Sequence, residues 1–209
     1  MKIKLLDYKK LKERPAPVEN FLAFDEASEG LDIFKDRLRS AGIGHLNISG
    51  SVLIEDYLVL CNQAKDDSIN HMIITTPEFR NDQLNVMLSV LPVHLPDEDK
   101  FRVAISGIIY SPKNDWLVFS AIKENSGPDK ESVKPGSYIG VIENAARKIG
   151  RKKMKVNSLT ELSTIEKKFK GFTAAGLSLQ SDKSEKIKAN VLADNDKNIA
   201  HLLHIRIKQ

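Results

Sequence analysis

Three glycine-led phrases constrain the fold of this chain more than any other feature of its sequence. They read NISGSVLI around Gly50, AISGIIYS around Gly107 and TAAGLSLQ around Gly176. After each glycine comes an apolar stretch, then a turn, then a second apolar stretch, and a third apolar stretch follows a polar loop. A phrase that returns with the same order of strands and turns indicates a structural repeat. The sequence therefore predicts three successive and similar sheet units.

Short apolar stretches bounded by turn residues run through most of the chain, and many such stretches favour an all-β fold. One short helix is predicted in SEGLDIFKDRLRSAG, where apolar residues share a helical face and Gly42 follows as a stop. The predicted strands are 20–25, 50–54, 57–61, 71–75, 84–90, 103–110, 116–122, 137–143, 177–180, 187–193 and 202–207. We interpret them as a partial or compact β-propeller with about three recognisable blades. A sandwich or meander with accidental similarity is the alternative.

The glycines have a physical reason in a propeller. The innermost strand of each blade runs close to its neighbours, where a side chain does not fit. We divide the chain into an N-terminal segment with an edge strand, residues 1–30, and a single domain of blade-like units, residues 31–209. About three blades leave sheet edges open, and open edges invite pairing. Either residues 1–30 or self-association covers those edges, and the sequence leaves both alternatives open.

Composition is that of a soluble globular protein, with 41% hydrophobic and 29% charged residues and a net charge of +4. The single cysteine, Cys61, excludes an intrachain disulfide and fits a reducing compartment. The N-terminus lacks the apolar run of a secretory signal, and no stretch approaches the roughly 20 apolar residues that span a bilayer. The sequence predicts a cytoplasmic protein without a membrane partner.

Polar residues at strand ends are the candidate ligand-binding residues. Asn62 follows a strand of the first unit, Glu124 ends the comparable strand of the second, and Asp194 and Asp196 follow that of the third. Asp194, Asp196 and Asn198 alternate in ADNDKN, and oxygen ligands at this spacing converge on Ca²⁺ when a loop curls around the ion. A turn whose side chains bond their own backbone is the simpler interpretation of the same residues.

Two further patterns were weighed and not favoured as sites. His201 and His204 are three residues apart, which on a strand places their rings on opposite faces. The basic run RKIGRKKMK, residues 147–155, is suited to phosphate groups, but no aromatic residue interleaves it to stack bases. A solvated loop is the simpler interpretation of this run, and the sequence does not favour nucleic acid as a partner.

Four stretches, taken in order, resemble an uncharacterised bacterial β-propeller family, a domain of unknown function. They are DIFKDRLRSAGIGHLNISGSVLIEDYLVL, ISGIIYSPKNDWLVFSAIKE with GSYIGVIE, GFTAAGLSL with VLADND, and LLHIRI. That family is distantly similar to phytase-like and esterase-like propellers. The resemblance covers the chain from about residue 20 to its end and implies successive blades opened by the glycine phrases. It also implies that Glu124 matches an acid of the family.

Two departures from that family bear on function. Ser49 and Ala175 stand where the family tends to place an acid before the glycine, and the family's chains begin with additional N-terminal blades. Because those acids are replaced, we do not expect an inherited hydrolytic site. The chain also carries no P-loop, CxxC, HExxH or GxSxG motif.

We therefore predict a non-catalytic module that binds a small molecule or a protein, without a cofactor. One alternative is a metal-dependent phosphate or ester hydrolase that uses Glu124, Asp194 and Asp196 around a divalent cation such as calcium. Another is a polyanion binder that uses the basic run.

Overall fold

A computed structural model describes residues 36–64, 69–75, 89–95, 102–124, 136–195 and 200–208. These residues are mostly β-strand, with a few short helical segments. The predicted segment 1–30, its boundary at residue 31, the strand at 20–25 and most of the strand at 84–90 lie outside the described residues. Within the described part of the chain, no helix is long and apolar enough to cross a membrane.

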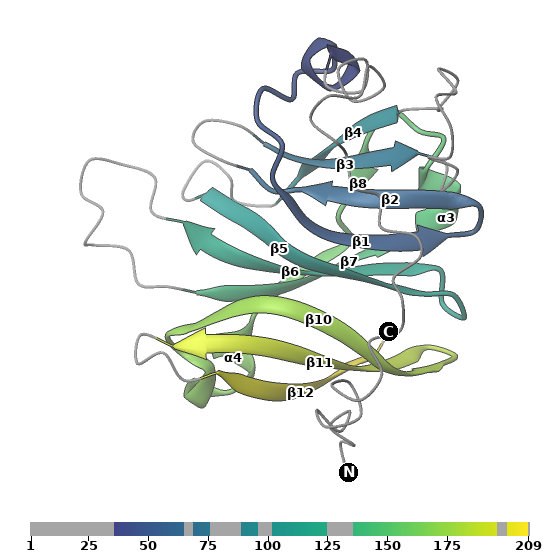
Figure 1. The fold of residues 1–209 in the computed structure, drawn as a ribbon. Coiled ribbons are helices and arrows are strands. Elements are labelled where there is room, and N and C mark those ends of the chain that lie inside the picture. The colour runs from purple at the N-terminus through teal and green to yellow at the C-terminus, as the bar shows by residue number, and fades with distance from the viewer. Residues whose placement is uncertain are drawn as a thin grey trace, which may run out of the picture.

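The strands form three separate sheets, which are stacked from top to bottom in Figure 1. The first sheet has the order β1-β2-β3-β4-β8, and its first four strands form an antiparallel meander. Its strands are β1 (Ile48–Ile54), β2 (Tyr57–Asn62), β3 (Asn70–Thr75), β4 (Ser89–His94) and β8 (Met154–Lys155). The last of these pairs in parallel with β4, although it follows the second unit in the sequence.

The second and third sheets repeat the meander. The second sheet has the order β5-β6-β7-β9, from strands β5 (Arg102–Ser111), β6 (Trp116–Glu124), β7 (Ser137–Glu143) and β9 (Ser158–Glu161). The third sheet has the order β10-β11-β12, from strands β10 (Phe172–Lys183), β11 (Lys186–Asn195) and β12 (His201–Lys208). Helical segments are residues 36–40, α3 (Ala145–Lys148), α4 (Leu162–Ile165) and the 3-10 turn η1 (Lys167–Phe169). The three predicted sheet units are thus confirmed.

The three repeated glycines lie side by side where the first strands of the sheets meet. A Cβ on Gly50 would lie 3.0 Å from the backbone nitrogen of Ile108 and 3.5 Å from Cα of Gly107. A Cβ on Gly107 would in turn lie 3.1 Å from Cα of Gly176. In each sheet the register between first and second strands also shifts just before the glycine, as a β-bulge does. The close approach of these backbones explains why the first two glycines carry no side chain.

Two apolar layers hold the sheets face to face, and β6 contributes to both. Phe119 and Leu117 point into the layer shared with the first sheet. Trp116 and Val118 point into the layer shared with the third sheet. Side chains alternate between the two faces of a strand, so a strand buried on both faces reads as a continuous apolar run. This is why the sequence WLVFSAI has no polar face.

A buried amide fastens the second sheet to the first. Asn70, the first residue of β3, donates from Nδ2 to the backbone oxygen of Val103 (2.8 Å) and accepts at Oδ1 from the nitrogen of Ile105 (2.9 Å). Oδ1 also accepts from the nitrogen of Ala64 (3.1 Å). Since β5 is the edge strand of its sheet, this side chain takes the place of a neighbouring strand for two of its backbone groups. We call this arrangement the clasp.

The clasp is repeated once and then ends. Ser137, the first residue of β7, donates from Oγ to the backbone oxygen of Phe172 (2.6 Å) and accepts from the nitrogen of Ala174 (2.8 Å). In each sheet, cross-strand pairs lead from the glycine, through one residue of the second strand, to one residue of the third strand. Asn70 and Ser137 each lie two residues before that third-strand residue. By the same count in the third sheet, the equivalent residue is Ala200, whose methyl group makes no hydrogen bond.

The repeated glycines give a matched pair of substitutions. We expect Gly107→Ala to cost about 1–3 kcal/mol, because the new methyl group meets the backbone of the third sheet. Gly176→Ala is the control, since a Cβ there has nothing within 4 Å among the described residues. Thermal unfolding of both variants measures the difference. Equal melting temperatures would mean that the first strands are not packed as described.

Candidate functional site

The third sheet has one face that is buried and apolar and one outward face, which we call the polar face although Leu192 and Leu202 are also exposed on it. On β11, Ile187, Ala189 and Val191 are buried against the second sheet. Lys188 and Asn190 alternate with them and therefore point to the opposite face. Among the described sheets this face lies at the end of the stack (Figure 1).

Basic side chains crowd one end of that polar face. Lys186 pairs with Lys183 of β10 and with Lys208 of β12, and Lys188 pairs with Arg206. We call these five residues the basic face. Like charges directly opposite each other on paired strands are destabilising. The neighbouring positive charges, Arg206 foremost, together with partial burial, lower the pKa of Lys186.

None of the five cations forms an ion pair with a carboxylate of the described residues. The five positive charges of the basic face repel one another, and an anion bound among them would reduce that repulsion. The arrangement is therefore suited to a negatively charged ligand.

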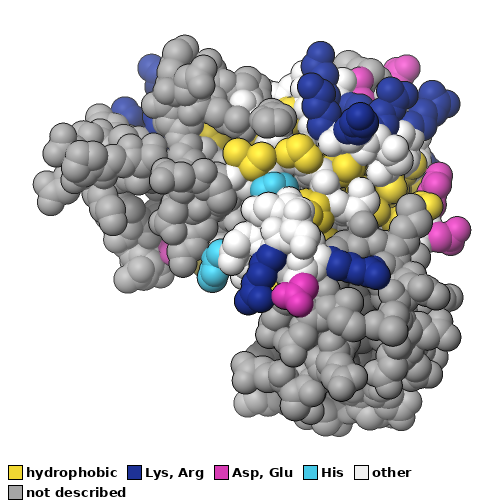
Figure 2. All heavy atoms as spheres, turned by 90° about the horizontal axis from the view of Figure 1, so that it is seen from above, with side chains coloured by type: hydrophobic (Ala, Val, Ile, Leu, Met, Phe, Trp, Pro, Cys, Tyr) yellow, Lys and Arg dark blue, Asp and Glu magenta, His cyan; other side chains and the backbone are white. Residues whose placement is uncertain are grey.

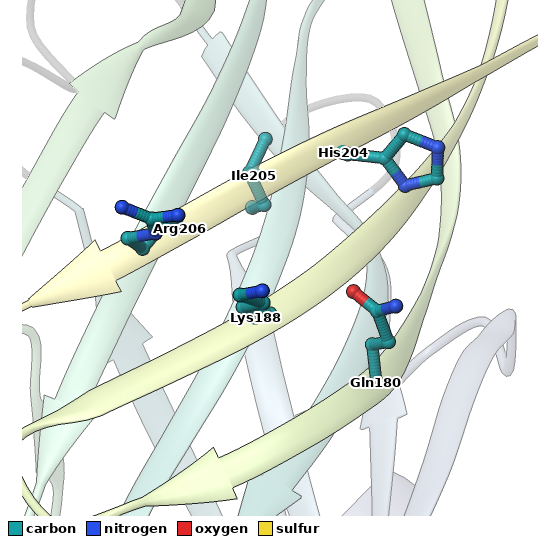
Figure 3. A pocket seen from close by; sticks show the side chains of 5 residues that line it. All are labelled: Gln180, Lys188, His204, Ile205 and Arg206. Atoms are coloured by element: carbon teal, nitrogen blue, oxygen red, sulfur yellow. The ribbon is translucent and has the colours of Figure 1, made fainter. Parts of the chain in front are cut away.

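A shallow pocket of about 350 Å³ opens on the basic face. Figure 3 shows its lining from all three strands: Gln180 from β10, Lys188 from β11, and His204, Ile205 and Arg206 from β12. Two cations, an amide and an imidazole thus border one hollow. Phosphate and carboxylate groups are the ligands that such donors recognise. Among the described residues, no carboxylate, thiol or hydroxyl borders it.

The imidazole in the pocket is held by a polar row across the sheet. His204 Nδ1 lies 2.8 Å from Oδ1 of Asn190, whose Nδ2 donates to Oγ of Ser178 (3.3 Å). Because an amide oxygen only accepts, Nδ1 carries the proton in this arrangement. Nε2 is then left as the second polar atom of the ring.

The family model that matches this chain spans residues 27–207 and is described as a family of unknown function, DUF6929. The chain belongs to the DUF6929 family. No curated protein matches it. The match runs through all three sheets to Ile207 of β12. The stacked first strands, the two clasps and the polar face of the third sheet therefore lie within the extent of the DUF6929 match.

The predicted residue Asn62 of this DUF6929 chain is buried and its amide is engaged within the fold. Oδ1 accepts from the backbone nitrogen of Asn47 (2.6 Å), and Nδ2 donates to the backbone oxygen of His45 (3.3 Å). Glu124 ends β6 and pairs with Arg102 of β5, and nothing is described of its side chain. These two residues lie on the first and second sheets, away from the strands that form the pocket.

The predicted calcium ligands are described only in part. Asp194 is exposed near the end of β11, six positions from Lys188, which is about 20 Å along a strand. Asp196 and Asn198 lie outside the described residues. Among the residues that the structure describes, no three His, Cys, Asp or Glu side chains gather as metal ligands would. Calcium binding by this DUF6929 loop stays a prediction.

The other residues weighed from the sequence are placed as follows. Strand β12 puts His201 and His204 on opposite faces, as predicted. Cys61 is buried, and that burial raises the pKa of its thiol to about 12, although a hydrogen bond to Ser49 acts in the other direction. A thiol with so high a pKa is unreactive at neutral pH.

The basic run of residues 147–155 forms a second cationic region, on α3 and β8 beside the first sheet. Figure 2, seen from the first-sheet end of the stack, shows a dense group of Lys and Arg next to a band of hydrophobic side chains. Lys148 donates from Nζ to the backbone oxygen of Lys155 (3.1 Å) and to Oδ1 of Asn157 (2.9 Å). Partial burial is the main cause that lowers the pKa of Lys148. This lysine thus holds the loop, whereas Arg151, Lys152 and Lys153 are exposed.

Sequence reasoning missed the basic face of this DUF6929 chain. The signal was the alternation in KIKAN on β11 and HIRIK on β12, where polar residues occupy every second position. Each segment alone reads as an ordinary half-buried strand. The charge cluster follows from the pairing register, which sets Lys188 opposite Arg206.

Proposed function

We propose that this chain is a non-catalytic binding module that binds anionic groups on the basic face of its third sheet. The observation that carries the proposal is the cluster of Lys183, Lys186, Lys188, Arg206 and Lys208, none paired with a described carboxylate, of which Lys188 and Arg206 line the pocket. Their mutual repulsion makes the face costly without an anion. The proposal includes a cytoplasmic setting, which the single buried cysteine supports.

We also propose that the three sheets are blades of a propeller-like arrangement. Adjacent first strands, face-to-face stacking and the repeated glycine support this interpretation. The sheets that are described do not close into a ring. A bacterial origin of the family and its distant relation to phytase-like propellers stay predictions, as does self-association of the chain.

Binding is favoured over hydrolysis by the chemistry of the pocket. A metal-dependent hydrolase needs carboxylates around its cation and its attacking water. Asp194 lies about 20 Å along β11 from Lys188. The pocket itself is bordered by cations, an amide and an imidazole, which hold an anion without activating water.

Titration of the full chain with inorganic tripolyphosphate at about 0.1 M ionic strength, where the Debye length is about 10 Å, tests the proposal. We expect the double variant Lys188→Glu, Arg206→Glu to weaken binding at least about tenfold, because two attractions become two repulsions. Binding should also weaken as salt is added. Isothermal titration calorimetry measures both effects.

The matched control is Lys152→Glu with Lys153→Glu, which changes the net charge equally in the second cationic region. We expect less than about a twofold loss of affinity, since charges more than a Debye length apart are largely screened. Equal losses in the two double variants would show that net charge, and not the basic face, attracts the ligand.

A further inference from the structure

Counted over the strands that the structure describes, the third unit has one strand fewer than the other two. In the first unit a fourth strand, β4, pairs with β3, and in the second unit β9 pairs with β7. In the third unit β12 is the last strand, and among the described strands only β11 pairs with it. The repeat therefore leaves the position of a fourth strand open at the outer edge of β12.

The strand β12 is well formed for pairing along its whole length. Its eight residues pair with β11 in an unbroken register from His201 to Lys208, and it contains neither proline nor glycine. An edge strand of this kind presents a row of backbone N–H and C=O groups to any extended chain beside it. Extended peptides bind proteins by adding a strand to such an edge.

The side chains of β12 define what an added strand would carry. His204, Arg206 and Lys208 alternate on the polar face, about 7 Å apart. Leu203 and Ile205 point to the other face, where they pack at the margin of the apolar layer and are only half-buried. Side chains of an added strand alternate with the same spacing. Acidic residues would then meet the cations, and apolar residues would complete the cover of the half-buried leucine and isoleucine.

We propose that the outer edge of β12 accepts an extended peptide of another protein in which acidic and apolar residues alternate. The acidic half of this assignment rests on the proposed anion binding, whereas the backbone pairing and the apolar half stand on the strand count and on the burial of β12. The added strand would complete a four-stranded third sheet. It would also place carboxylates beside Arg206 and Lys208, where no described carboxylate now pairs with them.

Two other occupants fit the chemistry less well. A second copy of β12, paired antiparallel around Arg206 or Ile207, would bring Arg206 and Lys208 close to the same cations of its partner, which is destabilising. A single-stranded nucleic acid would require aromatic platforms, and the outward residues of β12 offer none beyond the imidazole of His204.

The test uses the full chain and a short synthetic peptide that alternates Glu with Val. Its control is the same peptide with alternate backbone nitrogens methylated, which keeps the charges and removes the strand-forming N–H groups. We expect the unmodified peptide to bind at least about tenfold more tightly, because several backbone hydrogen bonds are lost in the control. Hydrogen exchange of the β12 amides should slow when the unmodified peptide is bound.

Arg206→Glu with Lys208→Glu should weaken the unmodified peptide, whereas Lys152→Glu with Lys153→Glu should not. Equal affinity of the two peptides, with tripolyphosphate also bound, would overturn strand addition and leave anion binding intact. Failure of both peptides and of tripolyphosphate would overturn both proposals. Slow exchange of those β12 amides that point away from β11 would show, in the free protein, that another part of this chain or a second copy already occupies the edge, which also overturns the inference.

Discussion

Gly140→Ala is expected to destabilise this protein by about 3 kcal/mol or more, which lies at the upper end of the cost of overpacking a core. Gly140 of β7 pairs directly with Phe119 of β6, and the phenyl ring lies across the glycine. A Cβ on Gly140 would lie 2.5 Å from both Cε atoms of the Phe119 ring and nearer still to its Cζ, far closer than van der Waals contact. Phe119 is fully buried in the layer between the first and second sheets, so the ring has no free space to move into.

Thermal unfolding should show a decrease in melting temperature of roughly 6–12 °C for a chain of this size. Gly150→Ala is the matched control, because a Cβ on that glycine has nothing within 4 Å among the described residues. Adding Phe119→Leu to Gly140→Ala should recover part of the lost stability, since the clashing ring is removed. If Gly140→Ala unfolds at the temperature of Gly150→Ala, the described contact between β6 and β7 is wrong.

The sheet units were predictable because the steric constraints on them determine residue types within short stretches of the sequence. Gly50 and Gly107 are required where backbones approach closely, and a recurring glycine at equal places in similar phrases records that constraint. The hairpin turns were equally visible. Glu55 and Asp115 take positive φ angles of 53° and 52° in the turns at IEDY and SPKNDW, whose Asp, Asn and Pro residues are typical of turns. The long apolar run of β6 likewise records burial on both faces.

What depends on distant pairing was not predictable. The segment KMKVNSL, residues 153–159, alternates like one strand, but only its last two residues lie in β9 of the second sheet. Met154 and Lys155 of β8 instead pair with β4 of the first sheet. The three glycines were also treated as equivalent, although a Cβ would meet another first strand only at the first two. A short stretch of sequence does not reveal which distant strand will pair with it or pack against it.

The candidate site shows the same limit. The search of the sequence favoured carboxylates in loops, such as Asp194, because alternating acids are a familiar pattern for a cation. The structure gathers cations instead, on paired strands whose registers bring Lys188 opposite Arg206. Asn62 was singled out as a strand-end amide, yet that amide holds residues 45 and 47. Residue type and strand position identify polar groups, but hydrogen-bond partners decide whether those groups face a ligand.

Asn70→Ala is expected to be the most destabilising change in the clasps, at about 4 kcal/mol. Asn70 is 2% exposed, and its side chain serves the backbone groups of Ala64, Val103 and Ile105. Removal of the amide leaves two N–H groups and one C=O group buried without a partner, at about 1–3 kcal/mol each. Alanine also leaves a small void between the first and second sheets.

Urea or thermal unfolding of a graded series separates this cause from a general sensitivity to substitution. Ser137→Ala, which leaves two backbone groups of β10 unpaired, should cost less than Asn70→Ala. Asn190→Ala is the control, because that amide lies on the polar face and its partners are exposed to water. Ala200→Ser should change stability by no more than about 0.5 kcal/mol, as surface substitutions do, because no described strand lies beyond the third sheet to receive the new hydroxyl. A series in which Asn190→Ala costs as much as Asn70→Ala would refute the clasp, since the effect would then not follow the unpaired backbone groups.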